Sequence, residues 1–187
     1  IGHSFDRKVM LIMQHPVLAE REHTENQIEQ TLEAIKDLDF QKVLIYPNVD
    51  SGNSKIIRTI DKYKKMEDFF VFENLERKLY LSLLKNSSIL VGNSSSGILE
   101  ASSFKIPVVN IGNRQRGRLQ SENIINCDYS KKTIIKSIKK ATSNKKFLLK
   151  IVKCKNPYGD GNSSRRILKI LKNITINNKL LDKRITY

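Results

Sequence analysis

The stretch that decides the fold is LVGNSSSGILEAS, from Leu90 to Ser102. An apolar run at 88–91 passes through Gly92, Asn93 and three serines directly into a second, helix-like run. This order is typical of a strand that turns into a helix, whose first backbone N–H groups have no partner within the helix. The serines can cap those groups, or the groups can bind an anion from outside. The residues of this stretch alone leave both uses open.

Outward from this stretch, short apolar runs alternate with amphipathic segments. The apolar runs predict six strands, at 9–13, 42–46, 69–72, 89–91, 107–111 and 123–125. Apolar side chains at helical spacing predict helices at 26–38, 54–64, 76–85, 97–103, 131–143 and 162–171. Such alternation predicts an α/β fold, a Rossmann-like doubly wound parallel sheet with helices on both faces. We expect one domain over residues 1–187, with 172–187 as a frayed tail.

The amino-acid composition argues against membrane proteins and metalloproteins. The chain has 187 residues, of which 39% are hydrophobic and 28% charged. No apolar run approaches the roughly 20 residues that cross a bilayer, so we expect no membrane contact. Two cysteines and three histidines show no metal-type spacing. We therefore expect no metal site, no cofactor and a reducing cytoplasmic location. Because the chain opens at Ile1 within a few residues of a strand, we expect it to be part of a longer protein.

The net charge of +15 is unevenly placed. Residues 130–187 contain 17 lysines and arginines but only two acids, Asp160 and Asp182, whereas the first 129 residues are balanced. A basic surface of this kind can bind nucleic acid. However, the lysines lie among Ile, Leu and Asn at helical spacing, without the aromatic side chains on which single-stranded bases stack. We favour solvated helix faces, and we do not expect nucleic acid as a partner.

Polar segments follow four of the expected strands, at 14–16, 47–51, 92–96 and 112–118. The carboxyl ends of parallel strands share one edge of the sheet, where open α/β sheets bind ligands. The serines suit a phosphate, Glu100 can accept the two hydroxyl hydrogens of a ribose, and Arg114 can supply charge near a diphosphate. His15 can donate to a phosphate or a sugar oxygen. Each residue also has a purely structural use, as a helix cap, a turn residue or a solvated loop.

Other nucleotide-binding classes are disfavoured by what the sequence lacks. It contains neither G-x-x-x-x-G-K-[ST] nor G-x-G-x-x-G. These two motifs are typical of P-loop ATPases and of Rossmann dehydrogenases. The expected nucleotide site is therefore of another kind.

Six segments together resemble one known family, over about residues 9–171. The matching segments are QHPV at 14–17, YPNVDSG at 46–52, GNSSSGILE at 92–100, PVVNIGNRQRGR at 107–118, ENI at 122–124 and NPYGDGN at 156–162. In order and spacing they are similar to the hydrolysing UDP-N-acetylglucosamine 2-epimerases, and most of all to the sialic-acid-pathway branch.

The resemblance implies the C-terminal domain of a GT-B enzyme, in which two Rossmann-like domains face one cleft. It places UDP or UDP-N-acetylglucosamine on His15, Leu75, Ser94, Ser95, Glu100 and Arg114. The serines would hold the diphosphate, Glu100 the ribose, and the backbone near Leu75 the uracil, while His15 and Arg114 would stabilise the leaving diphosphate. The family eliminates UDP and adds water to the resulting glucal, which gives N-acetylmannosamine. The acid/base carboxylates belong to the N-terminal domain, which this chain lacks.

The resemblance also implies partners. We expect the chain to bind its own N-terminal domain and, at full length, to form a homodimer or homotetramer. The basic C-terminal third would then pack against that other domain. This chain alone is expected to be inactive. Two alternatives stay open: the nucleotide-sugar-binding domain of a GT-B glycosyltransferase, and, more remotely, a basic nucleic-acid-binding module.

Overall fold

A computed structural model describes residues 5–182, apart from the side chain at 179. Its centre is a six-stranded sheet in which every neighbouring pair is parallel. The strands run in the order β3-β2-β1-β4-β5-β6. Their bounds are β1 Val9–Met13, β2 Gln41–Ile45, β3 Phe69–Phe72, β4 Ile89–Gly92, β5 Val108–Ile111 and β6 Ile124–Cys127. The order reverses between β1 and β4, as the doubly wound prediction requires, and this places the switch point at their carboxyl ends.

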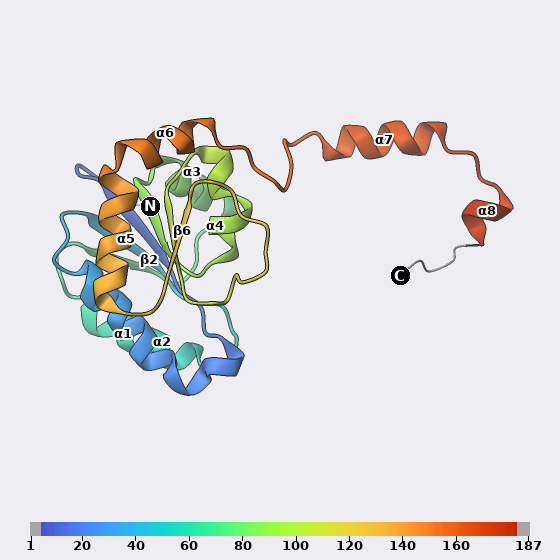
Figure 1. Cartoon of the computed structure of the whole chain (residues 1–187). Coiled ribbons are helices and arrows are strands. Elements are labelled where there is room, and N and C mark those ends of the chain that lie inside the picture. Colours follow the sequence, from blue (N-terminus) through green and yellow to red (C-terminus); the bar gives the residue numbers. More distant parts are fainter. Residues whose placement is uncertain (1–4, 183–187) are drawn as a thin grey trace. The chain divides into compact units, whose positions relative to one another are not determined.

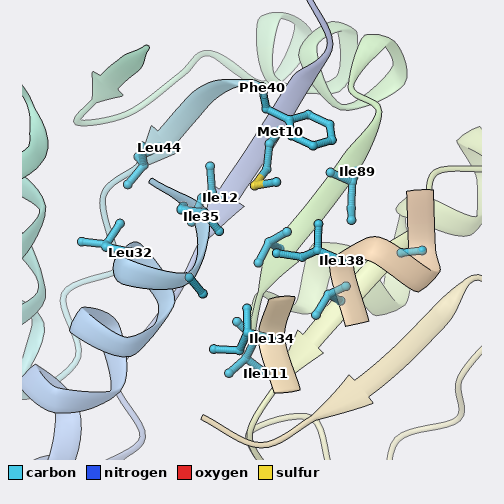
Figure 2. Packing of buried hydrophobic residues seen from close by; sticks show 14 of the residues in the cluster. Met10, Ile12, Leu32, Ile35, Phe40, Leu44, Ile89, Ile111, Ile134 and Ile138 are labelled. Atoms are coloured by element: carbon cyan, nitrogen blue, oxygen red, sulfur yellow. The ribbon is translucent and has the colours of Figure 1, made fainter. Parts of the chain in front are cut away.

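One face of the sheet is covered by α1 Thr24–Ile35, α2 Asn53–Tyr63, α5 Lys131–Ser143 and α6 Lys145–Lys153. Figure 2 shows how side chains from α1 and α5 meet side chains from the central strands. Ile12 and Ile89 of the sheet pack in one cluster with Leu32 and Ile35 of α1 and Ile138 of α5. The spacing of three and four residues turns one stripe of each helix toward the strands, and burying that stripe provides the main driving force for this layer.

The other face carries α3 Arg77–Asn86, α4 Ser95–Leu99 and the short 3-10 helix η2 Ala101–Phe104. Tyr80, Leu83 and Leu84 of α3 pack with Leu11 of β1 and Leu90 of β4. Successive residues of a strand point to opposite faces, so the fully apolar runs of β1 and β4 supply both clusters. The result is a three-layer α/β/α arrangement.

The compact unit that holds the sheet ends at Pro157, and a second unit begins at Tyr158. The second unit contains α7 Ser163–Asn173 and α8 Asn178–Leu181. Apolar side chains of α7, among them Ile167 and Ile170, are more than half exposed. Residues 183–187 of the expected tail lie outside the described part of the chain. The single domain over 1–187 stays a prediction.

The predicted elements are largely confirmed, with ends that differ by at most three residues. Three departures have physical causes. The sequence pattern did not predict α6, whose start is capped by the side chain of Asn144, which accepts from the Phe147 N–H at 2.9 Å. It also missed the 3-10 helix η1 Leu18–His23, which has no apolar period. The single helix expected at 97–103 is two pieces, because Glu100 ends α4 and η2 then runs to the left-handed Lys105.

Gly92 is where the sheet allows no side chain. Its φ is +129°, and a Cβ there would overlap the backbone carbonyl of Met13. We predict that Gly92→Ala lowers the free energy of unfolding by at least about 3 kcal/mol, since it combines backbone strain with a backbone clash. Gly117→Ala is the matched control, because Gly117 has φ +81° and a Cβ added there would meet nothing within 4 Å. It should lose only about 1–2 kcal/mol in urea denaturation. Equal losses would show that the clash at Gly92 relaxes.

Candidate functional site

Asn93 ties the exits of β1 and β4 together. It follows β4 directly and is 1% exposed. Its Oδ1 accepts from the backbone N–H of His15 at 2.7 Å, and its Nδ2 donates to the His15 carbonyl at 2.8 Å. Its own N–H donates to the carbonyl of Met13 at 3.1 Å. These bonds hold His15 beside the start of the serine stretch, at the switch point of the sheet.

The serines after Asn93 begin α4. Ser94 is the N-cap residue: its backbone is extended and its Oγ accepts from the N–H of Ser96 at 3.3 Å. Of the two uses that the sequence left open, Ser94 therefore serves the capping one. The Ser94 hydroxyl still has its own proton to donate, and both Ser94 and Ser95 line the adjoining pocket. Binding of an anion by this stretch stays a prediction.

A pocket of about 320 Å³ lies between α3, α4 and the carboxyl ends of β1 and β2. Four of the six predicted site residues line it, namely Leu75, Ser94, Ser95 and Glu100. The remaining lining residues are Met13, Ile45, Asn74, Arg77, Tyr80, Ser96 and Leu99. The pocket thus combines apolar walls with hydroxyl, carboxylate and guanidinium groups, which is the usual make-up of a small-molecule site.

Glu100 is held by neighbours that the sequence pattern did not indicate, Arg77 and Ser96. Its Oε2 accepts from Ser96 Oγ at 2.6 Å, and its Oε1 accepts from Arg77 Nη1 at 3.1 Å. The hydroxyl of Tyr80 in turn bonds Ser96 Oγ. A carboxylate has about four lone-pair positions, so Glu100 can accept further hydrogens from a ligand. The spacing of Ser96 and Glu100, four residues apart, is the signal that could have shown their contact.

Arg114 lies beside the serine stretch rather than in the pocket lining. Its Nη1 donates to the backbone carbonyl of Asn93 at 3.3 Å, and its Nη2 is 3.9 Å from Asp50 Oδ2. The buried Gln115 donates to the same Asn93 carbonyl at 2.8 Å. The loop after β5 is therefore anchored on the residue that precedes Ser94. This places the Arg114 guanidinium, with a quarter of its side chain exposed, next to the start of α4.

His15 is a neutral imidazole in this setting. Burial, and secondly the positive charge of Arg114, lower the pKa of His15 from its ordinary 6.5 to about 4. Its Nδ1 accepts from the backbone N–H of Asn48 at 3.1 Å. In a neutral ring the proton must then be on Nε2, which makes Nε2–H a donor. The influence of Arg114 on this pKa shows that the two side chains are close together. Neither of them lines the pocket.

This pKa makes stability depend on pH. Between pH 6.5 and 4 the unfolded chain binds a proton at His15 that the folded chain excludes, so the free energy of unfolding falls as pH falls. One such proton contributes at most about 1.4 kcal/mol per pH unit. We predict that His15→Gln has a shallower slope than the unchanged protein in urea denaturation at pH 7, 6 and 5. The exposed His23 provides the control, and His23→Gln should keep the slope. Identical slopes in all three proteins would contradict the prediction.

Within residues 5–182, no group of three or more His, Cys, Asp or Glu side chains is arranged to hold a metal ion. No helix in the same range is long and apolar enough to cross a membrane. Cys127 and Cys154 are both free thiols.

The topology and the place of the pocket define a class of protein, the Rossmann-like α/β domains that carry their pocket at the switch point of the sheet. Solved structures support that fold. The Neisseria meningitidis UDP-GlcNAc 2-epimerase bound to UDP-GlcNAc matches with a TM-score of 0.70 at 23% identity, over 90% of this chain and 46% of that one. A Staphylococcus aureus MnaA–UDP structure matches with a TM-score of 0.69 at 20% identity, over 89% and 45%.

The family follows from sequence comparison. The family model described as UDP-N-acetylglucosamine 2-epimerase matches residues 2–172. The UDP-N,N'-diacetylbacillosamine 2-epimerase (hydrolyzing) of Legionella pneumophila is 34% identical over 182 residues, 97% of this chain and 47% of that protein. The UDP-N-acetylglucosamine 2-epimerase of Neisseria meningitidis is 36% identical over 136 residues, 72% and 36%. This chain belongs to the UDP-N-acetylglucosamine 2-epimerase family, and it spans about half the length, or less, of these curated relatives.

Proposed function

We propose that this chain is the UDP-binding half of a hydrolysing UDP-N-acetylglucosamine 2-epimerase. The observation that carries the proposal is the pocket at the switch point, where Ser94, Ser95 and Glu100 lie together. Family membership supports the 2-epimerase activity for the full-length enzyme. The name of the Legionella relative supports the hydrolysing type.

In this proposal each site residue has one part of UDP to bind. The hydroxyls of Ser94 and Ser95 donate to the diphosphate, and Arg114 supplies positive charge beside it. Glu100 accepts from the two ribose hydroxyls. The backbone at Leu75, on the same pocket wall, hydrogen-bonds the uracil. The sugar is N-acetylglucosamine or its diacetylated bacillosamine analogue, and its pocket lies mainly in the other domain.

The chemistry of this half is stabilisation of the leaving group. Elimination breaks the bond between sugar C1 and the diphosphate oxygen and removes the proton from C2, giving 2-acetamidoglucal and UDP. Water then adds across the double bond, and N-acetylmannosamine results. Arg114 opposes the negative charge that develops on the diphosphate, and the neutral His15 donates a hydrogen bond from Nε2. The carboxylates that move the protons come from the N-terminal domain.

This chain binds its own N-terminal domain across the cleft, and the full-length enzyme is a cytoplasmic homodimer or homotetramer. No cofactor takes part, because elimination and hydration leave the redox state of the sugar unchanged.

Calorimetric titration with UDP tests the nucleotide site. We predict saturable one-to-one binding by this chain, weakened about tenfold or more by Glu100→Gln, since a hydrogen bond to a charged group contributes about 1.5–3 kcal/mol. Glu29→Gln removes an exposed carboxylate on α1 and should leave the affinity unchanged. Absence of saturable binding by the unchanged chain would overturn the proposal. Equal affinities in the chain and its Glu100→Gln variant would remove Glu100 from the site.

Turnover should require the other half. We predict that this chain releases no N-acetylmannosamine from UDP-N-acetylglucosamine, because the proton-transferring carboxylates are expected in the N-terminal domain. Product analysis by NMR over hours at high protein concentration measures this. Adding the N-terminal half of a homologous enzyme provides the positive control, in which product should form. Product formed by this chain alone would show that its own residues suffice for the proton transfers.

A further inference from the structure

Tyr80 has a hydroxyl that its packing does not need. Its ring lies in the apolar cluster of the second face, among Leu83, Leu84 and Leu90, and the residue is 9% exposed. A phenylalanine would fill the same space. A buried hydroxyl is destabilising unless it is hydrogen-bonded, and the Tyr80 hydroxyl finds its partner in Ser96 Oγ, at the wall of the pocket.

The hydrogen bonds in this wall can run in only one direction. Glu100 as a carboxylate only accepts, so Ser96 Oγ, 2.6 Å from Oε2, must donate its single proton to it. Ser96 Oγ then has only lone pairs to offer Tyr80, and Tyr80 is the donor. Burial raises the pKa of Tyr80 to about 12, which keeps the phenol protonated at neutral pH. The donation runs from Tyr80 to Ser96 to Glu100.

This relay restrains the carboxylate of Glu100. Ser96 engages Oε2 and Arg77 engages Oε1, so rotation of the carboxylate about its last bond would break both bonds. The two anchors are unequal. The Arg77 side chain is 73% exposed, whereas Tyr80 and Ser96 are buried. Hydrogen bonds in series polarise one another, and buried ones are less weakened by water. The relay from Tyr80 is therefore the firmer of the two restraints.

We propose that Tyr80 is a positioning residue of the nucleotide site: through Ser96 it fixes Glu100 in the orientation that accepts both hydroxyl hydrogens of a ribose. The pocket thereby distinguishes ribonucleotides from nucleotides that lack those hydroxyls. This inference rests on the proposed function, since it takes UDP as the ligand. Tyr80 itself need not touch the nucleotide, because its hydroxyl is already committed to Ser96.

A merely structural role for the hydrogen bond between Tyr80 and Ser96 would have different consequences for binding. If the bond only joined α3 to α4, its loss would affect every ligand of the pocket alike. If it positions Glu100, its loss would affect only ligands that carry the ribose hydroxyls. UDP and 2',3'-dideoxy-UDP differ in those hydroxyls alone, so they separate the two roles.

The experiment is calorimetric titration of both ligands into the unchanged chain and into Tyr80→Phe. The unchanged chain should bind UDP at least about tenfold more tightly than the dideoxy analogue. Tyr80→Phe should weaken UDP by about three- to tenfold and leave the dideoxy affinity unchanged, as expected for one hydrogen bond. Tyr63→Phe is the matched control, since Tyr63 also donates to a carboxylate, Glu33, at 2.8 Å, but outside the pocket. It should change neither affinity.

Each other result has a distinct meaning. Equal weakening of both ligands by Tyr80→Phe, or no change with either, overturns the positioning role while the UDP site stands. No binding of UDP by the unchanged chain overturns the proposed function and this inference together. If Tyr80→Phe proves poorly folded by circular dichroism, Ser96→Ala takes its place, because it removes the middle of the relay. It must show the same selective loss for UDP, and its failure to do so overturns the inference.

Discussion

The site depends on the amide side chain of Asn93. In a doubly wound sheet the connections that follow β1 and β4 leave toward opposite faces, and the ligand crevice lies where they part. Asn93 satisfies both backbone groups of His15, while its own carbonyl accepts from Gln115 and Arg114. Segments that follow three different strands therefore converge on one buried residue. Without its amide, the N–H of His15 would lose its partner in a part-buried position, which is costly.

Two sources of positive charge have to be separated, Arg114 beside the pocket and the lysine-rich C-terminal third. Near the pocket, His15 is neutral, and among residues 5–182 the Arg114 guanidinium has one carboxylate partner, Asp50 at 3.9 Å, with which it makes a long ion pair. Within the compact unit that ends at Pro157, most of the basic excess comes from the lysines of α5 and α6. On α5 the lysines face solvent while Ile134 and Ile138 are buried against the sheet, as the helical spacing of the sequence indicated. The overall charge of +15 thus says little about the ligand.

The sequence predicted the elements with a strong period and missed what depends on contacts distant along the chain. The strand at 69–72 matches β3 residue for residue, because four consecutive apolar residues bounded by polar ones leave little choice. The sequence predicted only some of the residues in the pocket wall. Ser94, Ser95 and Glu100 belong to one local stretch. Arg77 reaches Glu100, and Tyr80 reaches Ser96, from a helix about 20 residues earlier, and only the folded sheet brings the two segments together. Local pattern carries no register between such helices.

The interruption after α4 shows how local geometry serves the site. A continuous helix over 97–103 would bury Glu100 or expose it according to its period alone. Instead α4 ends at Leu99, yet the Glu100 N–H still donates to the Ser96 carbonyl at 2.9 Å, which keeps Glu100 one full turn after Ser96. The side chains of Ser96 and Glu100 therefore meet as in a helix. Every group of this wall comes from the one compact unit that ends at Pro157, so the fold of this unit alone sets the geometry of the wall.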